Sequence, residues 1–408
     1  MLIWVLWFWI EWKSTYNRLV KNWTKKENIV ILDENNNKNY LENLDEFDLI
    51  YKSPWISIYK PEIKKVLWKI TSQAEYFFNN FKWKIILISW SKWKSTTSTL
   101  LYKILKKSWK NVKLVWNIWN PIFDEIDFNN QPDYTVFEIS SYMLDSTPNV
   151  ISDYSILTNI YNVHTNWHFT HENYKKAKFK LLNSKYISSV STELFWKINN
   201  KKNIVRFWEW TKYFFDKNFI YWKRYQISID KIKLWWEHNY KNIASILPIL
   251  EKENIQQKHI EDILFSFWWL EHRQEFIWEI NNVKYYNDSI ATIPESVIQA
   301  LNRFSTDIDT IILWWQDSWF NYDELIDKIN NLPLKNVILL PNSLDNFANR
   351  FINKNVIKVN NMFQAVKNAK AKTAKWKICI LSPWAPSYNL FKNFEERGKL
   401  FKKLVLNT

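Results

Sequence analysis

The sequence predicts an α/β fold of three domains built on largely parallel sheets. Short apolar runs, typical of buried strands, alternate with helix-like runs along most of the 408 residues. One such strand, Lys84 to Ile88, leads through a tight turn into Lys-Ser-Thr and a helix-like run, Ser98 to Lys107. The alternation starts again near residue 270, so we divide the chain into residues 1–81, 82–269 and 270–408.

Tryptophan stands where this pattern calls for glycine. The chain has 28 Trp and 1 Gly, whereas glycine makes up roughly 7% of an average protein. Trp83, Trp109 and Trp376 fall at the boundaries of predicted elements, where glycine is common, and not on apolar faces. Some bacterial lineages read the codon UGA as glycine, while a common alternative table reads it as Trp. We therefore predict that most of these positions are glycine in the native protein and that a minority are genuine Trp.

The first 81 residues predict a Rossmann-like domain. Strand Leu2 to Leu6 precedes a helix from Lys13, and strand Ile29 to Leu32 ends in Asp33. With glycine in place of Trp, residues 7, 9 and 12 have G-x-G-x-x-G spacing, and Asp33 is placed to bond a ribose. A strand in residues 47–57 then runs into a Ser-Pro turn.

Residues 82–269 predict a P-loop ATPase-like domain with a mostly parallel sheet, because strand, tight turn, Lys-Ser-Thr and helix is the layout of a phosphate-binding loop. Lys94 would reach the β- and γ-phosphates of a nucleotide, and Ser95 or Thr96 would bind Mg²⁺. The loop comprises Trp90, Ser91, Lys92, Trp93, Lys94, Ser95 and Thr96. Further buried-strand candidates are Val112 to Val115, Tyr134 to Ile139 and Ser155 to Leu157.

Polar residues follow the strands of this second domain. Glu138, near the end of a strand, is placed to hold Mg²⁺ directly or through water, although a solvated acid is the simpler interpretation. His164, His168 and His171 lie in a segment predicted to be a loop, where they could bind zinc or simply face solvent. Lys178 falls on a predicted helix, and its spacing alone does not distinguish it from an ordinary solvated lysine.

Residues 270–408 predict a second Rossmann-like domain. Arg273 follows a turn and Asp288 follows a strand, at junctions where a ligand could bridge domains, or where they would be ordinary caps or surface charges. The expected strands are Glu275 to Ile280, Lys284 to Tyr286, Thr310 to Leu313, Val337 to Leu340 and Ile378 to Leu381. The expected helices are Pro294 to Arg303, Tyr322 to Ile329, Met362 to Ala369 and Phe391 to Leu404.

Charge and composition narrow the class of protein. The formal net charge of +15 suits anionic small substrates. The sequence has no dense basic block interleaved with stacking aromatic residues, so it gives no sign of nucleic-acid binding. The single Cys379 lies in an apolar strand, which favours a reducing cytoplasm. The apolar N-terminus lacks a basic region and a small-residue cleavage site and is too short to span a bilayer. We expect a cytoplasmic monomer with no membrane or nucleic-acid partner.

The order of these motifs resembles the Mur ligase family over essentially the whole chain. The most specific segment, "LSPWAPSYNLFKNFEERG" from Leu381 to Gly398, contains the single glycine and is similar to the family branch that adds D-glutamate. Other matching segments are "LWFWIEWKST", "KSPWIS", "SWSKWKSTT", "WNIWNP", "EISS", "NVHTNWH", "ENYKKAK", "WEHNYKN", "WLEHR" and "YYNDSIATIPES". The family has glycine at Trp7, Trp9, Trp12, Trp55, Trp90, Trp93, Trp116, Trp119, Trp236, Trp269, Trp314, Trp315 and Trp319. Trp167 is less clear, because relatives often carry an aromatic residue there.

The resemblance implies ATP-dependent addition of D-glutamate to UDP-N-acetylmuramoyl-L-alanine through an acyl phosphate. It implies that Lys94 neutralises the phosphates, that Ser95 or Thr96 with Glu138 holds a first Mg²⁺, and that His164 with a carbamylated Lys178 serves a second. For the nucleotide it implies Asn239, Asn242, Arg273 and Asp288. It implies that Asn117 and Ser141 contact the muramoyl substrate and that Ser53 is a further substrate-binding residue. For D-glutamate it implies Thr292, Ser387 and Phe394.

Three positions depart from the family pattern. Lys92 replaces the usual Asn of the ATP loop, and a cation beside phosphate is tolerable. Ile290 stands where many relatives have Lys, and Ser318 where a Lys or Arg often binds the D-glutamate carboxylate. A Mur-type ligase for another amino acid therefore remains an alternative. If the tryptophans are genuine, indoles at 90 and 93 would fill the phosphate space, and a non-catalytic nucleotide-sugar-binding relative becomes the better interpretation.

Overall fold

The computed structural model divides the chain into two compact units, Met1–Trp268 and Trp269–Thr408. Each unit is considered by itself, and the boundary predicted within the first unit at residue 81 stays a prediction. The described residues are 3–6, 11–21, 24–32, 40–89, 94–115, 121–126, 130–160, 165–222, 225–234, 237–267, 271–292, 294–314, 322–341, 347–385, 391 and 393–407. Among them, only the backbone is described at 4, 6, 32, 94, 165, 166, 238 and 295.

The chain begins with a parallel sheet of strand order β2-β1-β3-β4. Its strands are β1 Ile3–Leu6, β2 Ile29–Leu32, β3 Leu49–Lys52 and β4 Ile70–Thr71. The associated helices are α1 Glu11–Lys21, α2 Pro61–Lys64 and α3 Gln73–Asn80. The strand–helix–strand order predicted for this region is confirmed, with α1 beginning two residues before the expected Lys13.

A parallel sheet of order β10-β9-β8-β5-β7-β6 forms the centre of the first unit. Its strands are β5 Lys84–Ser89, β6 Val112–Val115, β7 Tyr134–Glu138, β8 Ser152–Leu157, β9 Ser184–Ser191 and β10 Ile204–Phe207. The middle of β5 is fully buried, as its apolar run predicts. Because β5 lies between β7 and β8, the strand order reverses there, and ligands of such sheets bind beside the carboxyl ends of the strands at this point.

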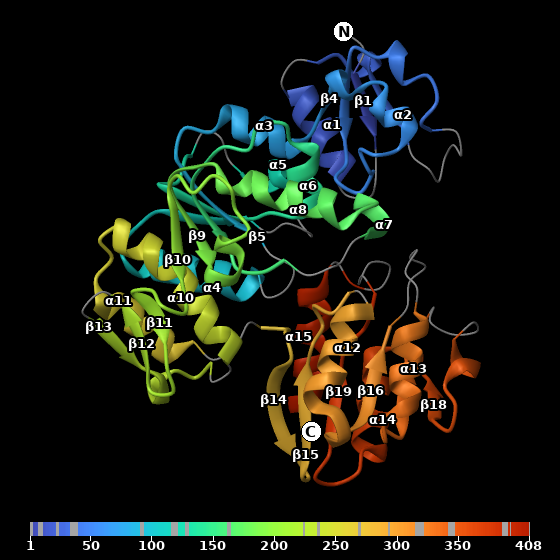
Figure 1. Ribbon diagram of the computed structural model, residues 1–408. Coiled ribbons are helices and arrows are strands. Elements are labelled where there is room, and N and C mark those ends of the chain that lie inside the picture. Colours follow the sequence, from blue (N-terminus) through green and yellow to red (C-terminus); the bar gives the residue numbers. More distant parts are fainter. Residues whose placement is uncertain are drawn as a thin grey trace. The chain divides into compact units, whose positions relative to one another are not determined.

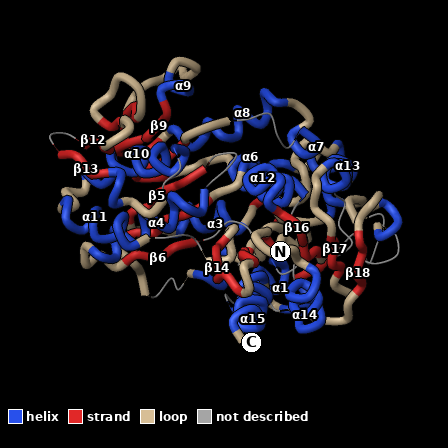
Figure 2. Tube along the Cα trace, turned by 90° about the horizontal axis from the view of Figure 1, so that it is seen from below, coloured by secondary structure: helices blue, strands red, loops and turns tan. Residues whose placement is uncertain are grey.

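Helices cover this sheet, and a small antiparallel sheet of β11 Tyr213–Phe215, β12 Phe219–Trp222 and β13 Tyr225–Ser228 lies beside them. The helix α4 after β5 packs against both α10 and α11, which come far later in the sequence (Figure 2). The sequence did not predict the antiparallel sheet. The helices are α4 Lys94–Lys107, α5 Ile122–Glu125, α6 Ser141–Ser146, α7 Thr165–His168, α8 His171–Phe179, α9 Thr192–Phe195, α10 Glu237–Lys252 and α11 Gln257–Ser266.

The second unit has a six-stranded sheet of order β14-β15-β19-β16-β17-β18, in which only the β14–β15 pair is antiparallel among the described strands. Helices α12 and α13 pack together (Figure 1), as do α14 and α15 (Figure 2). The strands are β14 Glu275–Ile280, β15 Val283–Asn287, β16 Ile308–Leu313, β17 Asn336–Leu339, β18 Asn355–Lys358 and β19 Ile378–Leu381. The helices are α12 Pro294–Phe304, α13 Asp323–Asn331, α14 Met362–Lys372 and α15 Phe394–Leu406.

The α/β fold with parallel sheets is therefore confirmed, and one local prediction is wrong. The segment carrying His168 and His171 was expected to be a loop but forms α7 and α8. Thr170 caps α8, because its hydroxyl accepts the Asn173 backbone N–H at 3.1 Å. Such a cap lets a polar, weakly periodic segment form a helix.

Several tryptophans adopt a backbone conformation that favours glycine. Within the described residues, φ is positive at Trp109, Trp208, Trp210, Trp376 and Trp384. A bulky side chain is rarely found there, because its Cβ crowds the backbone carbonyl. Trp109 and Trp210 are more than 90% exposed, so their indoles gain no burial that could offset the backbone strain of a positive φ. These positions are the ones where glycine would fit the chain best.

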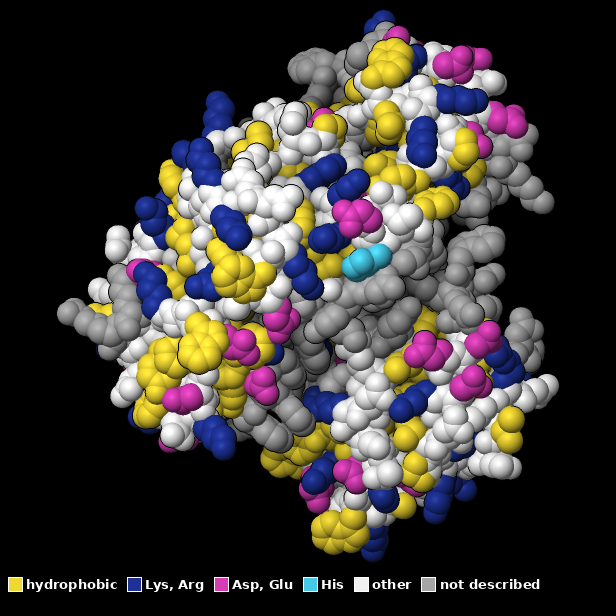
Figure 3. All heavy atoms as spheres, in the orientation of Figure 1, with side chains coloured by type: hydrophobic (Ala, Val, Ile, Leu, Met, Phe, Trp, Pro, Cys, Tyr) yellow, Lys and Arg dark blue, Asp and Glu magenta, His cyan; other side chains and the backbone are white. Residues whose placement is uncertain are grey.

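Charged side chains are spread diffusely over the described part of one face of the protein. On the face drawn in Figure 3, lysine and arginine side chains are spread among polar and apolar side chains, with acidic groups between them. Within the described ranges, no helix combines the length and apolar composition that a membrane crossing requires.

Cys379 is fully buried as its apolar strand predicts, and burial raises the pKa of its thiol.

Candidate functional site

The end of strand β5 and the start of helix α4 lie at the carboxyl edge of the central sheet. Strand β5 ends at Ser89 and helix α4 begins at Lys94, so the predicted phosphate loop joins a buried strand to a helix N-terminus. The side chains of Ser95 and Thr96 are buried in the first turn of α4. The loop residues Trp90, Ser91, Lys92 and Trp93 and the side chain of Lys94 lie outside the described residues.

Glu138 lies beside this helix turn. It pairs in register with Ile88 of β5, and its Oε2 is 3.4 Å from the Ser98 hydroxyl on α4. The Ser98 hydroxyl also donates to the carbonyl of Ser95 at 3.1 Å. The carboxylate therefore lies against the start of α4, and Glu138 is only 3% exposed.

The donor set at this edge fits Mg²⁺. Mg²⁺ favours oxygen ligands and is bound by one or two carboxylates together with waters and substrate phosphates. Glu138 supplies such a carboxylate, and Ser95 and Thr96 supply hydroxyls. Across the described residues, no three His, Cys, Asp or Glu side chains gather as a metal cluster, so these residues would be completed by water and by substrate.

Lys178 reaches the same edge from α8. Its Nζ donates to the Ser89 hydroxyl at 2.7 Å, and that hydroxyl donates to the carbonyl of Ile139, next to Glu138, at 2.6 Å. The lysine is only 2% exposed, and its Nζ lies 5.6 Å from the ring centre of Tyr174. An ordinary helix lysine keeps its ammonium in water, so this burial distinguishes Lys178 in a way that its spacing could not.

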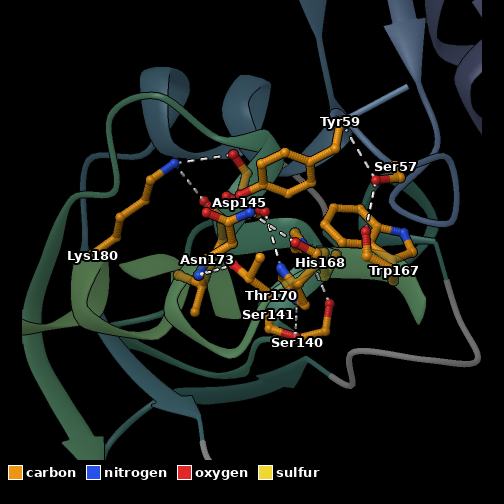
Figure 4. A network of polar contacts seen from close by, with 12 residues as sticks. Ser57, Tyr59, Ser140, Ser141, Asp145, Trp167, His168, Thr170, Asn173 and Lys180 are labelled. Carbon is orange, nitrogen blue, oxygen red and sulfur yellow. Dashed lines mark hydrogen bonds and ion pairs between the residues drawn. The ribbon is translucent and has the colours of Figure 1, made fainter. Parts of the chain in front are cut away.

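His168 is the centre of a buried polar cluster beside α6 (Figure 4). Its Nδ1 lies 3.1 Å from Oδ2 of Asp145, and its Nε2 lies 3.0 Å from the hydroxyl of Ser141. Ser141, a predicted substrate contact, is the first residue of α6 and comes three residues after Glu138, the last residue of β7. His171 is exposed at the start of α8, and His164 lies outside the described residues. The geometry of His168 matches hydrogen bonding within the protein, and no described metal cluster supports the zinc alternative.

The turn after β3 holds Ser53, a predicted substrate-binding residue. Its hydroxyl donates to Oε2 of Glu11 at 3.1 Å, and the neighbouring Lys52 ammonium donates to the carbonyls of Ser53 and Ile56 at 2.8 and 2.7 Å. Burial raises the pKa of Glu11 to about 7 and lowers the pKa of Lys52 to about 7, and their mutual attraction opposes both shifts without cancelling them. A small hollow is lined by both residues and by Thr15.

Two asparagines lie together near the start of α10. Asn239 and Asn242 are 2% and 4% exposed, and the amide of Asn242 donates to Oδ1 of Asn239 at 3.4 Å. The Nδ2 of Asn239 has no hydrogen-bond partner among the described residues. A buried amide without a partner is costly, which supports the prediction that a ligand binds here.

In the second unit, Asp288 lies at the carboxyl ends of two adjacent strands. Its Oδ1 accepts the Gln274 backbone N–H at 3.0 Å, and its Oδ2 accepts the Ser382 hydroxyl at 2.8 Å. Burial raises the pKa of Asp288 to about 7, while the Ser382 hydrogen bond and the charge of Arg273 lower it. Thr292 is buried in the same segment. Because the two units are considered separately, a nucleotide shared between Asp288 and Asn239 stays a prediction.

The end of the predicted D-glutamate segment packs against the same region of the second unit. The carbonyl of Phe394 accepts the Ser289 hydroxyl at 2.8 Å, and Arg397 donates to the carbonyls of Ser289 and Ala385 at 2.7 and 3.1 Å. Arg397 is fully buried, so α15 is held to the segment after β15. Ser387 lies outside the described residues.

The structure thus brings Ser95, Thr96, Glu138 and Lys178 to one edge of the central sheet. Asn117 and Ser318 lie outside the described residues. Sequence reasoning missed some of the supporting residues. Ser89 was visible as a polar residue ending an apolar strand, whereas the pairing of Asp145 with His168 has no signal in the spacing of the sequence. The supporting residues that were not predicted are Glu11, Lys52, Ser89, Asp145 and Arg397.

Comparison with known proteins gives consistent matches. Residues 91–246 match the family model described as the Mur ligase middle domain. A UDP-N-acetylmuramoylalanine–D-glutamate ligase of Clostridium kluyveri is 31% identical over 391 residues, covering 90% of this chain and 84% of that protein. The protein of the same name from Oenococcus oeni is 29% identical over 397 residues, covering 90% and 88%.

Solved structures with a similar fold are more distant in sequence. A UDP-N-acetylmuramate-alanine ligase from Thermotoga maritima superposes with a TM-score of 0.56 at 14% identity, covering 99% of this chain and 98% of that chain. A MurF ligase from Thermotoga maritima in complex with ADP has a TM-score of 0.52 at 15% identity, covering 88% and 89%. These two similarities concern the fold.

Proposed function

The chain belongs to the Mur ligase family and is an ATP-dependent ligase of peptidoglycan synthesis, and we propose that it joins D-glutamate to UDP-N-acetylmuramoyl-L-alanine. Proteins with this activity in their names match the chain over nine tenths of its length. We further propose that it needs two Mg²⁺ ions, and that it works as a monomer in the cytoplasm without a nucleic-acid or membrane partner.

The observation that best supports this proposal is the meeting of four predicted residues at the carboxyl edge of β5 and β7. Glu138 lies against the first turn of α4, which carries Ser95 and Thr96, and Lys178 reaches Ser89 beside them. A helix N-terminus after a buried strand suits the phosphates of a nucleoside triphosphate, and the nearby oxygen ligands suit its metal ion. The same edge is the switch point of the sheet, where ligands of this architecture bind.

In the proposed reaction, the carboxylate of the L-alanine residue attacks the γ-phosphorus of ATP, the bond from this phosphorus to the bridging β-phosphate oxygen breaks, and ADP leaves as an acyl phosphate forms. The amine of D-glutamate then attacks the acyl carbon, and inorganic phosphate leaves as the amide forms. Phosphoryl transfer depends mainly on in-line positioning and charge neutralisation. Lys94 would neutralise phosphate charge, while Glu138 with Ser95 or Thr96 would hold the first Mg²⁺ against the phosphates.

Lys178 would act with His164 at the second Mg²⁺. An ammonium cannot ligate a cation, but carbamylation of its nitrogen by CO₂ gives a carboxylate-like oxygen ligand. The burial of Lys178 supports this, because an ordinary helix lysine keeps its nitrogen in water, whereas this nitrogen is held inside the protein. Its hydrogen bond to Ser89 already directs the side chain to the edge where Glu138 lies.

The remaining predicted residues would hold the substrates. Asn239, Asn242, Arg273 and Asp288 are proposed for the nucleotide, and the unpartnered amide of Asn239 supports its part in this. The muramoyl substrate would contact Ser53, Asn117 and Ser141, and D-glutamate would contact Thr292, Ser387 and Phe394. Closure of the C-terminal region over ATP is expected for such an enzyme.

The direct test is a ligation assay with purified protein, MgCl₂, ATP, UDP-N-acetylmuramoyl-L-alanine and D-glutamate. We expect one phosphate released for each amide formed, and a product whose mass shows one added glutamate. Release of phosphate without D-glutamate, or equal reaction with L-glutamate or D-alanine, would contradict the proposed specificity. Glu138→Gln should lower kcat by about 100-fold or more, because a neutral amide holds Mg²⁺ more weakly than a carboxylate, and the charge of the metal ion stabilises the transferred phosphoryl group.

A different amino acid is the second candidate, because Ile290 and Ser318 depart from the family pattern at its expected site. Ligation assays with a panel of amino acids decide between them. A non-catalytic relative is the third candidate and depends on genuine Trp at residues 90 and 93. Fragmentation mass spectrometry of the native peptide spanning residues 86–97 tests this, and glycine at both positions is the result we expect.

A further inference from the structure

A serine, a histidine and an aspartate form a continuous buried relay beside α6 that the proposed reaction does not yet use. His168 lies between Ser141 and Asp145, one helical turn apart on α6, with nitrogen–oxygen distances of 3.0 and 3.1 Å (Figure 4). The imidazole is fully buried, and Ser141 and Asp145 are 3% and 9% exposed. Water therefore competes little for the hydrogen bonds inside the relay.

The helix under this relay is fixed at both ends. The Ser140 hydroxyl accepts the Met143 backbone N–H at 3.1 Å and caps its start. At its end, the Lys180 ammonium donates to the carbonyls of Leu144, Asp145 and Thr147 at 3.1, 3.0 and 3.1 Å. Ser141 and Asp145 therefore keep their spacing without any help from the imidazole.

The histidine itself is held from two directions. The amide of Asn173 on α8 donates to its carbonyl at 2.9 Å. The preceding Trp167 is tied to the turn after β3, because its carbonyl accepts the Ser57 hydroxyl at 2.8 Å and its indole N–H donates to the carbonyl of Trp55 at 3.2 Å. The same turn carries Ser53, so one short segment connects this predicted substrate-binding turn to Ser141.

The directions of the hydrogen bonds in the relay depend on the tautomer of His168, and a neutral ring beside an ionised carboxylate has one preferred tautomer. An ionised carboxylate only accepts hydrogen bonds, so the imidazole hydrogen that faces Asp145 must sit on Nδ1. A neutral imidazole with its hydrogen on Nδ1 accepts at Nε2. The hydroxyl of Ser141 must then donate inward to Nε2, which leaves the lone pairs of its oxygen for a hydrogen-bond donor from outside.

We propose that His168 and Asp145 are positioning residues that make Ser141 a hydrogen-bond acceptor for the nucleotide-linked sugar peptide. This deepens the proposed function and rests on it. The matching group on the substrate is an amide N–H or a hydroxyl of its muramoyl-alanine part. Asp145 acts only through His168, and His168 acts only through the orientation of the Ser141 hydroxyl.

Asp145→Asn is the sharpest variant, because it changes almost no volume. Its amide can donate to Nδ1, which moves the imidazole hydrogen to Nε2 and turns the Ser141 hydroxyl outward as a donor. We expect the Kd for UDP-N-acetylmuramoyl-L-alanine, measured by calorimetry, to rise about 10-fold in Asp145→Asn and in Ser141→Ala, as the loss of one hydrogen bond predicts. The Kd for MgATP should stay within about twofold of wild type.

The double variant tests whether Asp145 acts through Ser141. If it does, adding Asp145→Asn to Ser141→Ala produces no further loss of affinity. Losses that multiply, or an unchanged Kd in Asp145→Asn, overturn the proposal. Covalent labelling of Ser141 by a fluorophosphonate would also overturn it, because the hydroxyl would then be an activated nucleophile.

Two control variants separate positioning from general damage. Tyr59→Phe removes the hydroxyl that also bonds Asp145 and leaves the imidazole contacts in place. Thr170→Ala removes the cap of α8 without touching the relay. We expect Tyr59→Phe to leave the Kd unchanged, and Thr170→Ala to lower Tm with the Kd within about twofold. Equal loss of affinity in Thr170→Ala would favour a structural role for α7 and α8 and overturn the proposal.

The tautomer can be measured directly by ¹⁵N NMR of protein labelled at its histidines, with His168→Gln providing the assignment. We expect hydrogen on Nδ1 in the wild type and on Nε2 in Asp145→Asn, and the opposite wild-type tautomer would overturn the relay. Neither NMR nor calorimetry requires turnover. Absence of ligation with an intact relay and the expected Kd changes would therefore contradict the proposed function and leave this inference standing.

Discussion

The ammonium of Lys178 lies 2.7 Å from the hydroxyl of Ser89, at the carboxyl end of β5, and is almost completely buried. Helix α8 supplies the lysine and the central sheet supplies the serine, so two distant segments place an amine beside the phosphate-loop strand. Burying a charged group costs free energy unless it is compensated. A function for the nitrogen explains this arrangement better than stability does.

Replacing Lys178 by Met should remove activity while leaving the fold intact. The two side chains have similar size, and the exchange of a buried charge for an apolar group is often neutral for stability. We expect kcat to fall about 100-fold or more, with Tm within a few degrees of wild type. Lys175→Met on the same helix is the matched control, since Lys175 pairs only loosely with Glu172 at 4.0 Å. Comparable kcat values for the two variants would contradict a role for Lys178.

Trp109 provides a test of the glycine prediction on the protein as its sequence is given. It occupies the C′ position of α4 with φ 61°. Its N–H donates to the carbonyl of Lys106 at 3.1 Å, and the next N–H, of Lys110, donates to that of Leu105 at 3.3 Å. This pattern of bonds is the Schellman motif, in which C′ is usually glycine. Trp109→Gly should therefore raise the free energy of unfolding by about 1 kcal/mol.

Trp167 is the matched comparison, because its indole is buried and its N–H is satisfied by the carbonyl of Trp55. It also stacks on Tyr142 with ring centres 4.8 Å apart. Trp167→Gly should lower the free energy of unfolding by about 3–5 kcal/mol. Chemical denaturation of both variants measures the difference. A loss of stability in Trp109→Gly would be evidence that Trp is the native residue there.

Gly398 is the only glycine of the sequence, and it lies inside helix α15 for a reason of space. A Cβ at this position would lie 2.2 Å from Nδ1 of His272. The imidazole cannot withdraw easily, because the Asn287 amide bonds Nδ1 at 2.8 Å and the residue is 2% exposed. Gly398→Ala should lower the free energy of unfolding by about 1–3 kcal/mol despite its better helix propensity.

Lys399→Ala is the control for Gly398→Ala, since it places alanine at the next position of α15, which is exposed and has no close packing to disturb. We expect it to alter the free energy of unfolding by less than about 0.5 kcal/mol. Thermal unfolding of the two variants side by side provides the measurement. Equal stability of Gly398→Ala and wild type would mean that the close packing of His272 on α15 does not constrain the helix.

Sequence patterns predicted the parallel sheets well because buried parallel strands are continuous apolar runs. Strands β6, β14 and β19 have their predicted bounds, and Lys84–Ser89 extends the predicted strand by one residue. The antiparallel strands β11 to β13 were missed, since they are short and lie among aromatic and polar residues without clear alternation. In the parallel sheets, β4, β9, β10 and β18 were not predicted, and in β9 serines interrupt the apolar pattern. The hydroxyls of Ser155, Ser184 and Ser188 bond one another inside the sheet, which satisfies them without apolar side chains.

The candidate site was predicted in its residue types and not in its contacts. Lys178 and Glu138 could be named from motifs, since both lie in segments whose order resembles a known family. Their support could not be named, because the pairs His168 with Asp145 and Lys178 with Ser89 are 23 and 89 residues apart. Contacts at such separations depend on topology, which local periodicity does not encode.

Asp288 predicts a specific pH dependence of stability. Burial raises its pKa from 3.8 to about 7 in the folded protein. Between these values the folded state holds a proton that the unfolded state has released, so stability must fall as pH rises from about 4 to 7. The contribution of this one group has a slope of up to about 1.4 kcal/mol per pH unit. Asp288→Asn removes it, because an amide has the same shape and does not titrate.

We therefore expect the unfolding free energy of Asp288→Asn, relative to wild type, to rise with pH between 4 and 7 and then level off. The Asn oxygen still accepts the Gln274 backbone N–H, while the Ser382 hydroxyl can turn to accept from the amide. Denaturant titrations at pH 4, 5.5, 7 and 8 measure the difference. A constant difference across this range would show that Asp288 titrates near its ordinary pKa, and that the charge of Arg273 and the two hydrogen bonds outweigh its burial.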